Sequence, residues 1–272
     1  MSYNVKKHGE VISTDIRTSI STRYKAVTKA INREFWDFWD SQSDKEHSLY
    51  VGSYGRGTAI NTSDVDILVE LPEDEYNRHN VYKGNGQSRL LQAVREAILN
   101  TYPRSDVRAD GQVVKIAFSD GMKFEILPAF VTYGWNGIIY KYPDTNMGGN
   151  WRSTNPKAEQ DAMRDKNKSS NGLLFDTCKH MRYIRDNYFK SYHLSGIVID
   201  SFVYAAIKNW RWTPPEESSS AAEPGEYEKL LYDYYLYNLR FSNTINAPGS
   251  NDYVDVSSSK DCLEKVLLKM CI

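Results

Sequence analysis

"VGSYGRGTAINTSDVDILVEL", residues 51–71, places a glycine-rich polar turn directly before two aspartates in an apolar strand. In a strand, residues two apart face the same side, so Asp64 and Asp66 project together while Val65 and Ile67 point to a core. Neighbouring carboxylates repel each other, and burying one of them without a partner is costly. The stretch therefore predicts that a cation lies between the two acids.

A third acid, Glu125, recurs in a similar apolar setting in "FEILPAF", residues 124–130. Carboxylate oxygens are hard ligands that favour Mg²⁺ or Mn²⁺. Three converging carboxylates can hold two metal ions about 3.5–4 Å apart for in-line phosphoryl or nucleotidyl transfer. Each part alone is common, since Asp-x-Asp pairs often lie in loops and a single Glu often marks a strand edge. Their combination predicts that Asp64, Asp66 and Glu125 are catalytic metal ligands.

Gly52 and Ser53 are predicted to bind phosphate groups close to these metals. Such a turn offers backbone N–H groups and a hydroxyl, and the helix that it is expected to open adds a positive end. A Gly-Ser turn alone says little, so this prediction depends on the acids that follow it.

Composition restricts the classes of function that are open. The 272 residues carry a formal net charge of −1, so no overall basic field indicates nucleic-acid binding. The cysteines Cys178, Cys262 and Cys271 are too few and irregular for a disulfide framework or a zinc site. The opening "MSYNVKKHGEVISTD" lacks the apolar core of a signal peptide, and no run of eighteen apolar residues occurs. We expect a cytoplasmic protein.

Hydrophobic periodicity predicts that the first half is α+β. Apolar residues three and four apart indicate amphipathic helices over residues 16–38 and 88–102. Strand patterns occur within residues 47–55, 64–71, 105–109, 113–118 and 123–130. This order of elements predicts a mixed or antiparallel sheet with helices on one side.

The second half is predicted to be a helical lobe. Helical patterns cover residues 155–167, 173–188, 196–210 and 226–241. The proline- and serine-rich residues 213–225 predict a loop, Ser258 with Asp261 predicts the cap of a final short helix, and His180 is expected on a helix surface. The chain therefore divides into a core at 1–154, including the long N-terminal helix, and a closely packed helical lobe at 155–272.

The pattern Gly52-Ser53, Asp64-Val65-Asp66 and Glu125 resembles that of the polymerase-β-like nucleotidyltransferase superfamily. Within it, "GSYGRGTAINTSDVDILVEL", "FEILPAF" and "NPKAEQDAMRDKN" look like the cGAS/DncV-like nucleotidyltransferases (CD-NTases) of bacterial anti-phage defence systems. The resemblance covers residues 15–210. It implies a two-lobed fold, with a nucleotidyltransferase core packed against a helical lobe and the active site in the cleft between them.

The resemblance also implies nucleotide-binding residues in the second lobe. A lysine of the helix at 173–188 contacts the triphosphate in the family, which assigns Lys179 first and Arg182 second. A serine at the start of the next helix binds phosphate, and Ser195 occupies that place. A solvated basic face and a helix cap explain these residues equally well. Gly196 stands where animal members carry a base-stacking tyrosine, so the residue that stacks the donor base is open.

The activity implied by the resemblance is the joining of ribonucleoside triphosphates into a cyclic di- or trinucleotide second messenger for anti-phage defence. It implies two Mg²⁺ ions, with Mn²⁺ possible, the release of pyrophosphate, and a separately encoded effector that responds to the product. We expect a monomer, with neither a membrane nor double-stranded DNA as a partner.

Two other activities stay open. One is a nucleotidyltransferase that makes linear oligonucleotides or modifies a protein or RNA. The other is an inactive module that binds nucleotides or partners, which the presence of all three acids disfavours.

The aromatic, glycine-rich residues 133–151 either shape the cleft for the acceptor nucleotide or form a surface hairpin.

Overall fold

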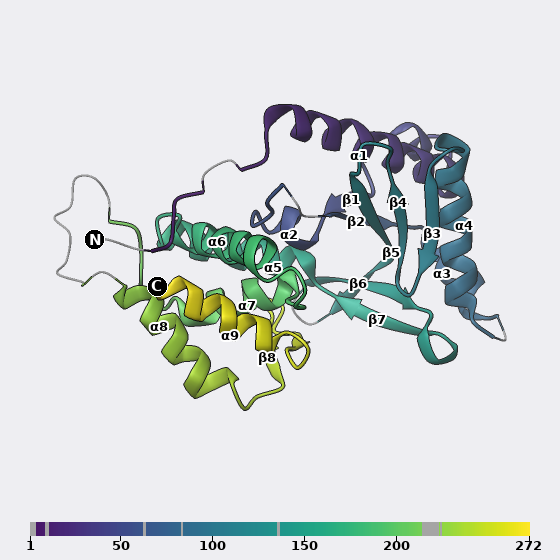
Figure 1. Cartoon of the computed structure of the whole chain (residues 1–272). Helices are drawn as coiled ribbons and strands as arrows, with labels where there is room; N and C mark the ends of the chain where they lie inside the picture. Colours follow the sequence, from purple (N-terminus) through teal and green to yellow (C-terminus); the bar gives the residue numbers. More distant parts are fainter. Residues whose placement is uncertain are drawn as a thin grey trace. The chain divides into compact units, whose positions relative to one another are not determined.

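The computed structural model describes residues 4–8, 11–61, 64–82, 84–134, 137–213, 223 and 225–272. The chain forms two compact units, drawn in Figure 1. The sheet unit comprises Ser13–Gly55 and Asp64–Asn155, and the helical unit comprises Met1–Ile12, Arg56–Ser63 and Pro156–Ile272. No helix among the described residues is long and apolar enough to cross a membrane.

Two short segments of the first half belong to the helical unit, although the sequence assigned them to the core. In the first segment, Val5 is buried in the hydrophobic core of the helical unit. His8 Nε2 lies 3.0 Å from His180 Nδ1 on α6 (Leu173–Tyr188). His180 itself is buried rather than on the helix surface as predicted, and burial lowers its pKa to about 4. In the second segment, Arg56 and Thr58 donate buried hydrogen bonds to Asp200 of the helical unit.

The sheet unit contains the predicted mixed sheet. Its path is β1 (Ser48–Tyr50), β2 (Val65–Glu70), β5 (Lys123–Gly134), β4 (Val113–Ala117) and β3 (Asp106–Asp110). The strand β6 (Gly137–Asp144) pairs with β5 and with β7 (Asn150–Thr154). Among the strand pairs described for this sheet, β2 and β5 run parallel and the others run antiparallel. The described part of residues 133–151 takes part in the β5–β6 and β6–β7 hairpins, and its role in shaping the cleft for the acceptor nucleotide stays a prediction.

The helices of the sheet unit are α1 (Thr14–Phe35), α2 (Gly52–Gly55), α3 (Glu73–Asn80) and α4 (Gly86–Thr101). The helix predicted over residues 88–102 corresponds to α4, and its apolar residues Leu91, Val94 and Ile98 are fully buried. α4 packs on β3, β4 and α1, while α1 also contacts β2. The helix α3 was not predicted, because its polar sequence "EDEYNRHN" shows no apolar stripe.

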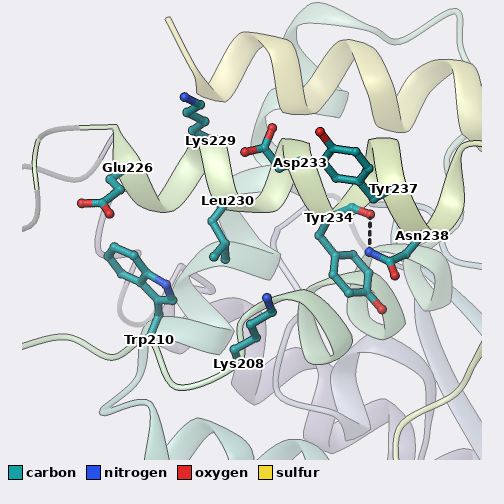
Figure 2. A pocket seen from close by; sticks show the side chains of 9 residues that line it. All are labelled: Lys208, Trp210, Glu226, Lys229, Leu230, Asp233, Tyr234, Tyr237 and Asn238. Atoms are coloured by element: carbon teal, nitrogen blue, oxygen red, sulfur yellow. Dashed lines mark hydrogen bonds between the residues drawn. The ribbon is translucent and has the colours of Figure 1, made fainter.

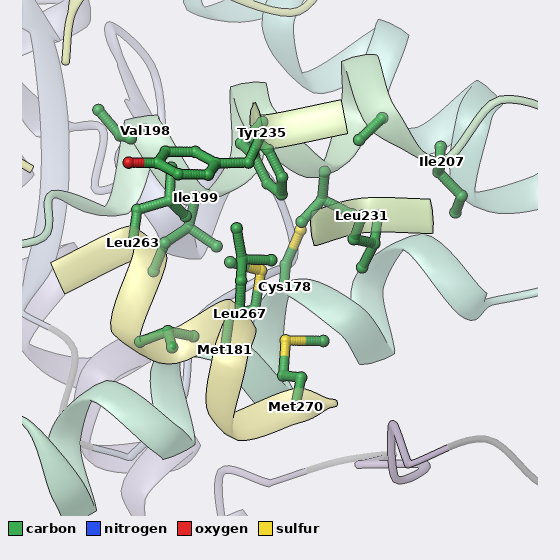
Figure 3. Close-up of a cluster of buried hydrophobic side chains, with 14 of the residues drawn as sticks. Cys178, Met181, Val198, Ile199, Ile207, Leu231, Tyr235, Leu263, Leu267 and Met270 are labelled. Atoms are coloured by element: carbon green, nitrogen blue, oxygen red, sulfur yellow. The ribbon is translucent and has the colours of Figure 1, made fainter. Parts of the chain in front are cut away.

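The helical unit is built around α5 (Pro156–Ser169), α6, α7 (Gly196–Ala206), α8 (Glu226–Tyr234) and α9 (Lys260–Met270). A π-helical turn, η3 (Tyr235–Leu239), continues α8, and β8 (Thr244–Asn246) pairs with β9 (Tyr253–Asp255). Figure 3 shows the core to which α6, α7, α8 and α9 contribute Met181, Ile199, Leu231 and Leu267. Burial of these apolar stripes explains why the predicted helices form.

The start of α9 differs from the prediction, and the predicted loop before α8 lies partly outside the described residues. The N-cap of α9 is Ser259 rather than Ser258, and its side chain makes no cap hydrogen bond. Instead, Ser259 Oγ accepts a hydrogen bond from the backbone N–H of Ser195 at 3.2 Å. Within the predicted loop at 213–225, residues 214–222 and 224 lie outside the described residues.

Candidate functional site

The parallel pairing of β2 and β5 sets Asp66 directly opposite Glu125. Val65 and Ile67 are buried on β2, as are Phe124 and Ile126 on β5, whereas the two acids between them are half-buried. Side chains alternate along a strand, so the two carboxylates share one face of the sheet. Asp64 is exposed and immediately precedes β2. Of the three acids found in the sequence, two therefore lie at paired positions on neighbouring strands, and the third lies directly before one of these strands.

The Gly52 turn lies against Asp66. Gly52 has a φ of 58°, and a Cβ at this position would clash with the Asp66 carboxylate oxygen Oδ2. The backbone N–H of Val51 donates to the Asp66 carbonyl oxygen at 2.9 Å. Ser53 follows within α2, which has only four residues, so a helix dipole contributes less here than the sequence suggested. The close approach of backbone and carboxylate explains why the position requires glycine.

Lys115 is a neighbour of Glu125 that the sequence analysis missed. It lies opposite Glu125 in the antiparallel pairing of β4 and β5. Its Nζ lies 2.8 Å from Asp110 Oδ2 and 3.3 Å from Glu125 Oε1. The hydrogen bond to Asp110 and the charge of Glu125 outweigh partial burial and raise the pKa of Lys115. A lysine in the apolar strand "VVKIA" was the available signal, but only strand register identifies its partner.

The donor chemistry of the three acids fits a hard divalent cation. Asp66 and Glu125 offer carboxylate oxygens at paired strand positions, and Asp64 offers another directly before β2; such oxygens suit Mg²⁺ or Mn²⁺. Among the described residues, no group of three or more His, Cys, Asp or Glu side chains is gathered as a metal site. The fit therefore rests on strand register, donor type and the glycine that admits the Asp66 carboxylate.

The three residues predicted to bind nucleotide from the helical unit differ in their surroundings. Arg182 is 1% exposed, and its Nη1 and Nη2 donate to the two carboxylate oxygens of Asp200 at 2.7 and 2.9 Å. This burial argues against direct phosphate binding by Arg182. Ser195 caps α7, accepting from the backbone N–H of Val198 at 3.4 Å. Lys179 is half-buried on α6.

Asp200 is the centre of a buried polar network that the sequence analysis also missed. Besides the Arg182 pair, Asp200 Oδ2 accepts from Arg56 Nε at 2.8 Å and from Thr58 Oγ1 at 2.9 Å. Arg56 Nη1 also donates to Glu159 Oε2 at 2.9 Å. Burial raises the pKa of Asp200, but the two guanidinium groups outweigh it and hold that pKa below its ordinary value.

This network anchors the segment that follows the Gly52 turn in sequence. Arg56 comes directly after α2, and both Arg56 and Thr58 are buried. An acid within the apolar run "GIVIDSFV" of α7 was a signal that Asp200 needs a buried cation. The network explains why residues 56–63 belong to the helical unit.

Comparison with known proteins shows to which protein family this chain is related. A family model for the Second Messenger Oligonucleotide or Dinucleotide Synthetase (SMODS) domain matches residues 10–167, more than half of the chain. A curated relative, a probable cyclic nucleotide synthase of Bacillus cereus (strain VD146), is 24% identical over 160 residues. The match covers 54% of this chain and 47% of the relative, so the chain spans about half the length of the curated relative that it matches.

Solved structures of similar proteins share the fold. The CdnE cyclic dinucleotide synthase of Elizabethkingia meningoseptica, solved with GTP and Apcpp, has a TM-score of 0.62 at 14% identity, covering 98% of this chain and 93% of that one. A variant of the dinucleotide cyclase DncV of Vibrio cholerae has a TM-score of 0.64 at 11% identity, covering 98% and 89%. These likenesses confirm the predicted α+β, polymerase-β-like fold. With the matched SMODS model, they show that the chain belongs to the SMODS-domain family of cGAS/DncV-like nucleotidyltransferases.

Proposed function

We propose that this protein is a metal-dependent nucleotidyltransferase that joins ribonucleoside triphosphates into a cyclic di- or trinucleotide second messenger. The observation that carries the proposal is the registered pair Asp66 and Glu125 beside the Gly52 turn, with Asp64 two residues before Asp66. Membership of a family of second-messenger synthetases supports the class of product. We further propose a role in anti-phage defence, with a separately encoded effector that responds to the product.

Asp64, Asp66 and Glu125 would hold two Mg²⁺ ions, with Mn²⁺ as a substitute. When bound, such ions neutralise the charge that develops on the transferred phosphoryl group. The chain itself supplies the base. A 2′- or 3′-hydroxyl oxygen of one nucleotide attacks the α-phosphorus of another, and its proton passes to the Glu125 carboxylate. The bond from the α-phosphorus to the bridging oxygen breaks, and pyrophosphate leaves with the electron pair. A second such step closes the ring.

Four residues are proposed to bind the triphosphate: Gly52, Ser53, Lys179 and Ser195. The Gly52–Ser53 backbone lies beside Asp66, where it can donate N–H groups to phosphate oxygens. The GTP and Apcpp in the Elizabethkingia structure support nucleoside triphosphates as the substrate class. Arg182 is assigned to the buried Asp200 network instead.

The identity of the product tests this proposal. Purified protein is incubated with all four ribonucleoside triphosphates and Mg²⁺ or Mn²⁺, then with alkaline phosphatase, and analysed by mass spectrometry. We expect pyrophosphate release and a phosphatase-resistant product whose mass is one water below that of the linear form with the same nucleotides and phosphates. A cyclic product resists because every phosphate is a diester. Glu125→Gln serves as the blank.

Other outcomes of the same assay would contradict the cyclase. A ladder of linear products that phosphatase trims would favour a synthase of linear oligonucleotides. A labelled macromolecule would favour the modification of a protein or RNA. Absence of pyrophosphate release with both metals would argue against nucleotidyl transfer by the isolated chain.

Lys179→Ala is expected to raise the KM for nucleoside triphosphate more than it lowers kcat. A phosphate contact distant from the α-phosphorus contributes to ground-state and transition-state binding alike, so its loss affects mainly KM. Steady-state kinetics of pyrophosphate release measure both constants. Lys168→Ala, at an exposed lysine on α5 of the same unit, is the matched control. An unchanged KM would contradict a phosphate contact and would favour the alternative that Lys179 belongs to a solvated basic face of the helix.

A further inference from the structure

The helical unit contains a pocket of about 430 Å³ that no step of the proposed reaction uses (Figure 2). Its volume lies in the range typical of small-molecule sites. None of its lining residues is among the predicted site residues. The lining consists of Lys208, Trp210, Glu226, Lys229, Leu230, Asp233, Tyr234, Tyr237 and Asn238.

The backbone around this pocket is irregular at two places. The turn η3 (Tyr235–Leu239) is π-helical, and π-helical turns are frequent at functional sites. Lys208 has a φ of 49°, and its carbonyl oxygen accepts from Lys166 Nζ at 2.6 Å. Left-handed backbone at a residue other than glycine costs free energy and clusters at ligand-binding positions. Both irregularities present side chains to the same pocket.

Two aromatic walls of the pocket are backed by the core. The Trp210 ring lies 5.5 Å, centroid to centroid, from that of the buried Tyr227. The Tyr234 ring meets the buried Phe202 edge-on at 5.9 Å. Trp210 and Tyr234 are both half-buried. Each ring therefore packs against a core residue on one side and lines the pocket with its remaining surface. Supported aromatic faces bind planar heterocycles by stacking.

The polar groups complement a planar anion. Figure 2 shows the Lys208 ammonium pointing into the pocket among Trp210, Leu230 and Tyr234. Asn238 Nδ2 donates to the Tyr234 carbonyl oxygen at 3.1 Å, which fixes the amide and presents its Oδ1 as an acceptor.

The pocket is also lined by two carboxylates, those of Glu226 and Asp233, and by a second ammonium group, that of Lys229. Glu226 Oε2 accepts from the backbone N–H of Glu223 at 3.1 Å at the start of α8. The two lysines balance the charge of the two carboxylates, and Figure 2 shows the Lys208 ammonium rather than a carboxylate between Trp210 and Tyr234.

We propose that this pocket is a second nucleotide site that binds a nucleoside phosphate. The base lies against Trp210 and Tyr234, an exocyclic amine donates to Asn238 Oδ1, and the phosphate pairs with the Lys208 ammonium. The site is made wholly of residues of the helical unit, and ligand binding there requires neither Asp66 nor a metal ion.

Isothermal titration calorimetry with AMP, GMP, CMP and UMP, each alone, tests the site. The protein is Asp66→Asn in EDTA, so that neither metal nor turnover contributes. We expect at least one nucleotide to bind saturably. Lys208→Ala and Trp210→Leu should each weaken that binding by about tenfold or more, whereas Trp210→Phe should retain most of it because it keeps a stacking face. Lys190→Ala, at an exposed lysine of the helical unit outside the pocket, should change nothing.

Two results would overturn the site. One is the absence of saturable binding by all four nucleotides with a Kd below about 1 mM. The other is binding that Lys208→Ala and Trp210→Leu both leave unchanged. Circular dichroism checks that the variants fold, and if Trp210→Leu does not, Lys208→Ala decides because Lys208 is exposed. Pyrophosphate release by the unmodified protein tests the proposed reaction separately, so either proposal can fail alone.

Discussion

Asp66→Asn should abolish turnover and leave the fold intact. The substitution keeps the size of the side chain but removes a charged ligand that the proposed metal ions require. Because bound metals supply several kcal/mol of transition-state stabilisation, we expect a loss of about 1,000-fold or more in kcat. The melting temperature should stay the same or rise slightly, because Asp66 faces Glu125 across the β2–β5 pair and loses a repulsion.

Pyrophosphate release in Mg²⁺ and in Mn²⁺, together with thermal unfolding, measures both effects. Glu70→Gln is the matched control, since Glu70 is a half-buried acid on the same strand and the same face. It should retain activity. Wild-type turnover by Asp66→Asn would show that the acids do not hold the metal.

Asp200→Ala should destabilise the helical unit by about 3–5 kcal/mol, because it leaves two buried guanidinium groups without their shared carboxylate. Arg56 and Arg182 both donate to Asp200, which is fully buried. Burial leaves water unable to replace the lost partner. The expected effect is therefore far larger than that of an exposed ion pair.

Urea unfolding followed by circular dichroism measures this loss. Asp261→Ala is the control, because Asp261 pairs with Lys265 at 3.3 Å on α9 and is 67% exposed. Exposed pairs of this kind contribute about 0–1 kcal/mol. A loss below about 1 kcal/mol for Asp200→Ala would mean that the buried network relaxes or admits water.

The elements that could be predicted from sequence are those with a strong local period. The apolar strand 64–71 and the helix 173–188 correspond to β2 and α6. Helix α3 and strands β6 and β7 were missed or left open, because their sequences are polar or interrupted by Pro and Gly. Such segments take their structure from the neighbours on which they pack.

The site was predictable only in part, for a related reason. Residue type and spacing predicted Asp64, Asp66 and Glu125 as site residues, but the pairing of Asp66 with Glu125 depends on strand register, which no local pattern specifies. The i, i+3 spacing of Lys179 and Arg182 suggested one basic face. Burial of Arg182 depends on Asp200, eighteen residues away on another helix.

The parallel β2–β5 pair has a consequence for how the chain folds. Asp66 and Glu125 are 59 positions apart (125 − 66), with α3, α4, β3 and β4 between them. Pairing so distant in sequence is slow, because the loop must close before any strand contact compensates for the lost entropy. At synthesis rates of about 5–20 residues per second, the apolar edge of β2 waits roughly 3–12 s for its partner to be made. During that interval one edge of β2 has no partner strand, so aggregation competes with folding at the strand that carries Asp66.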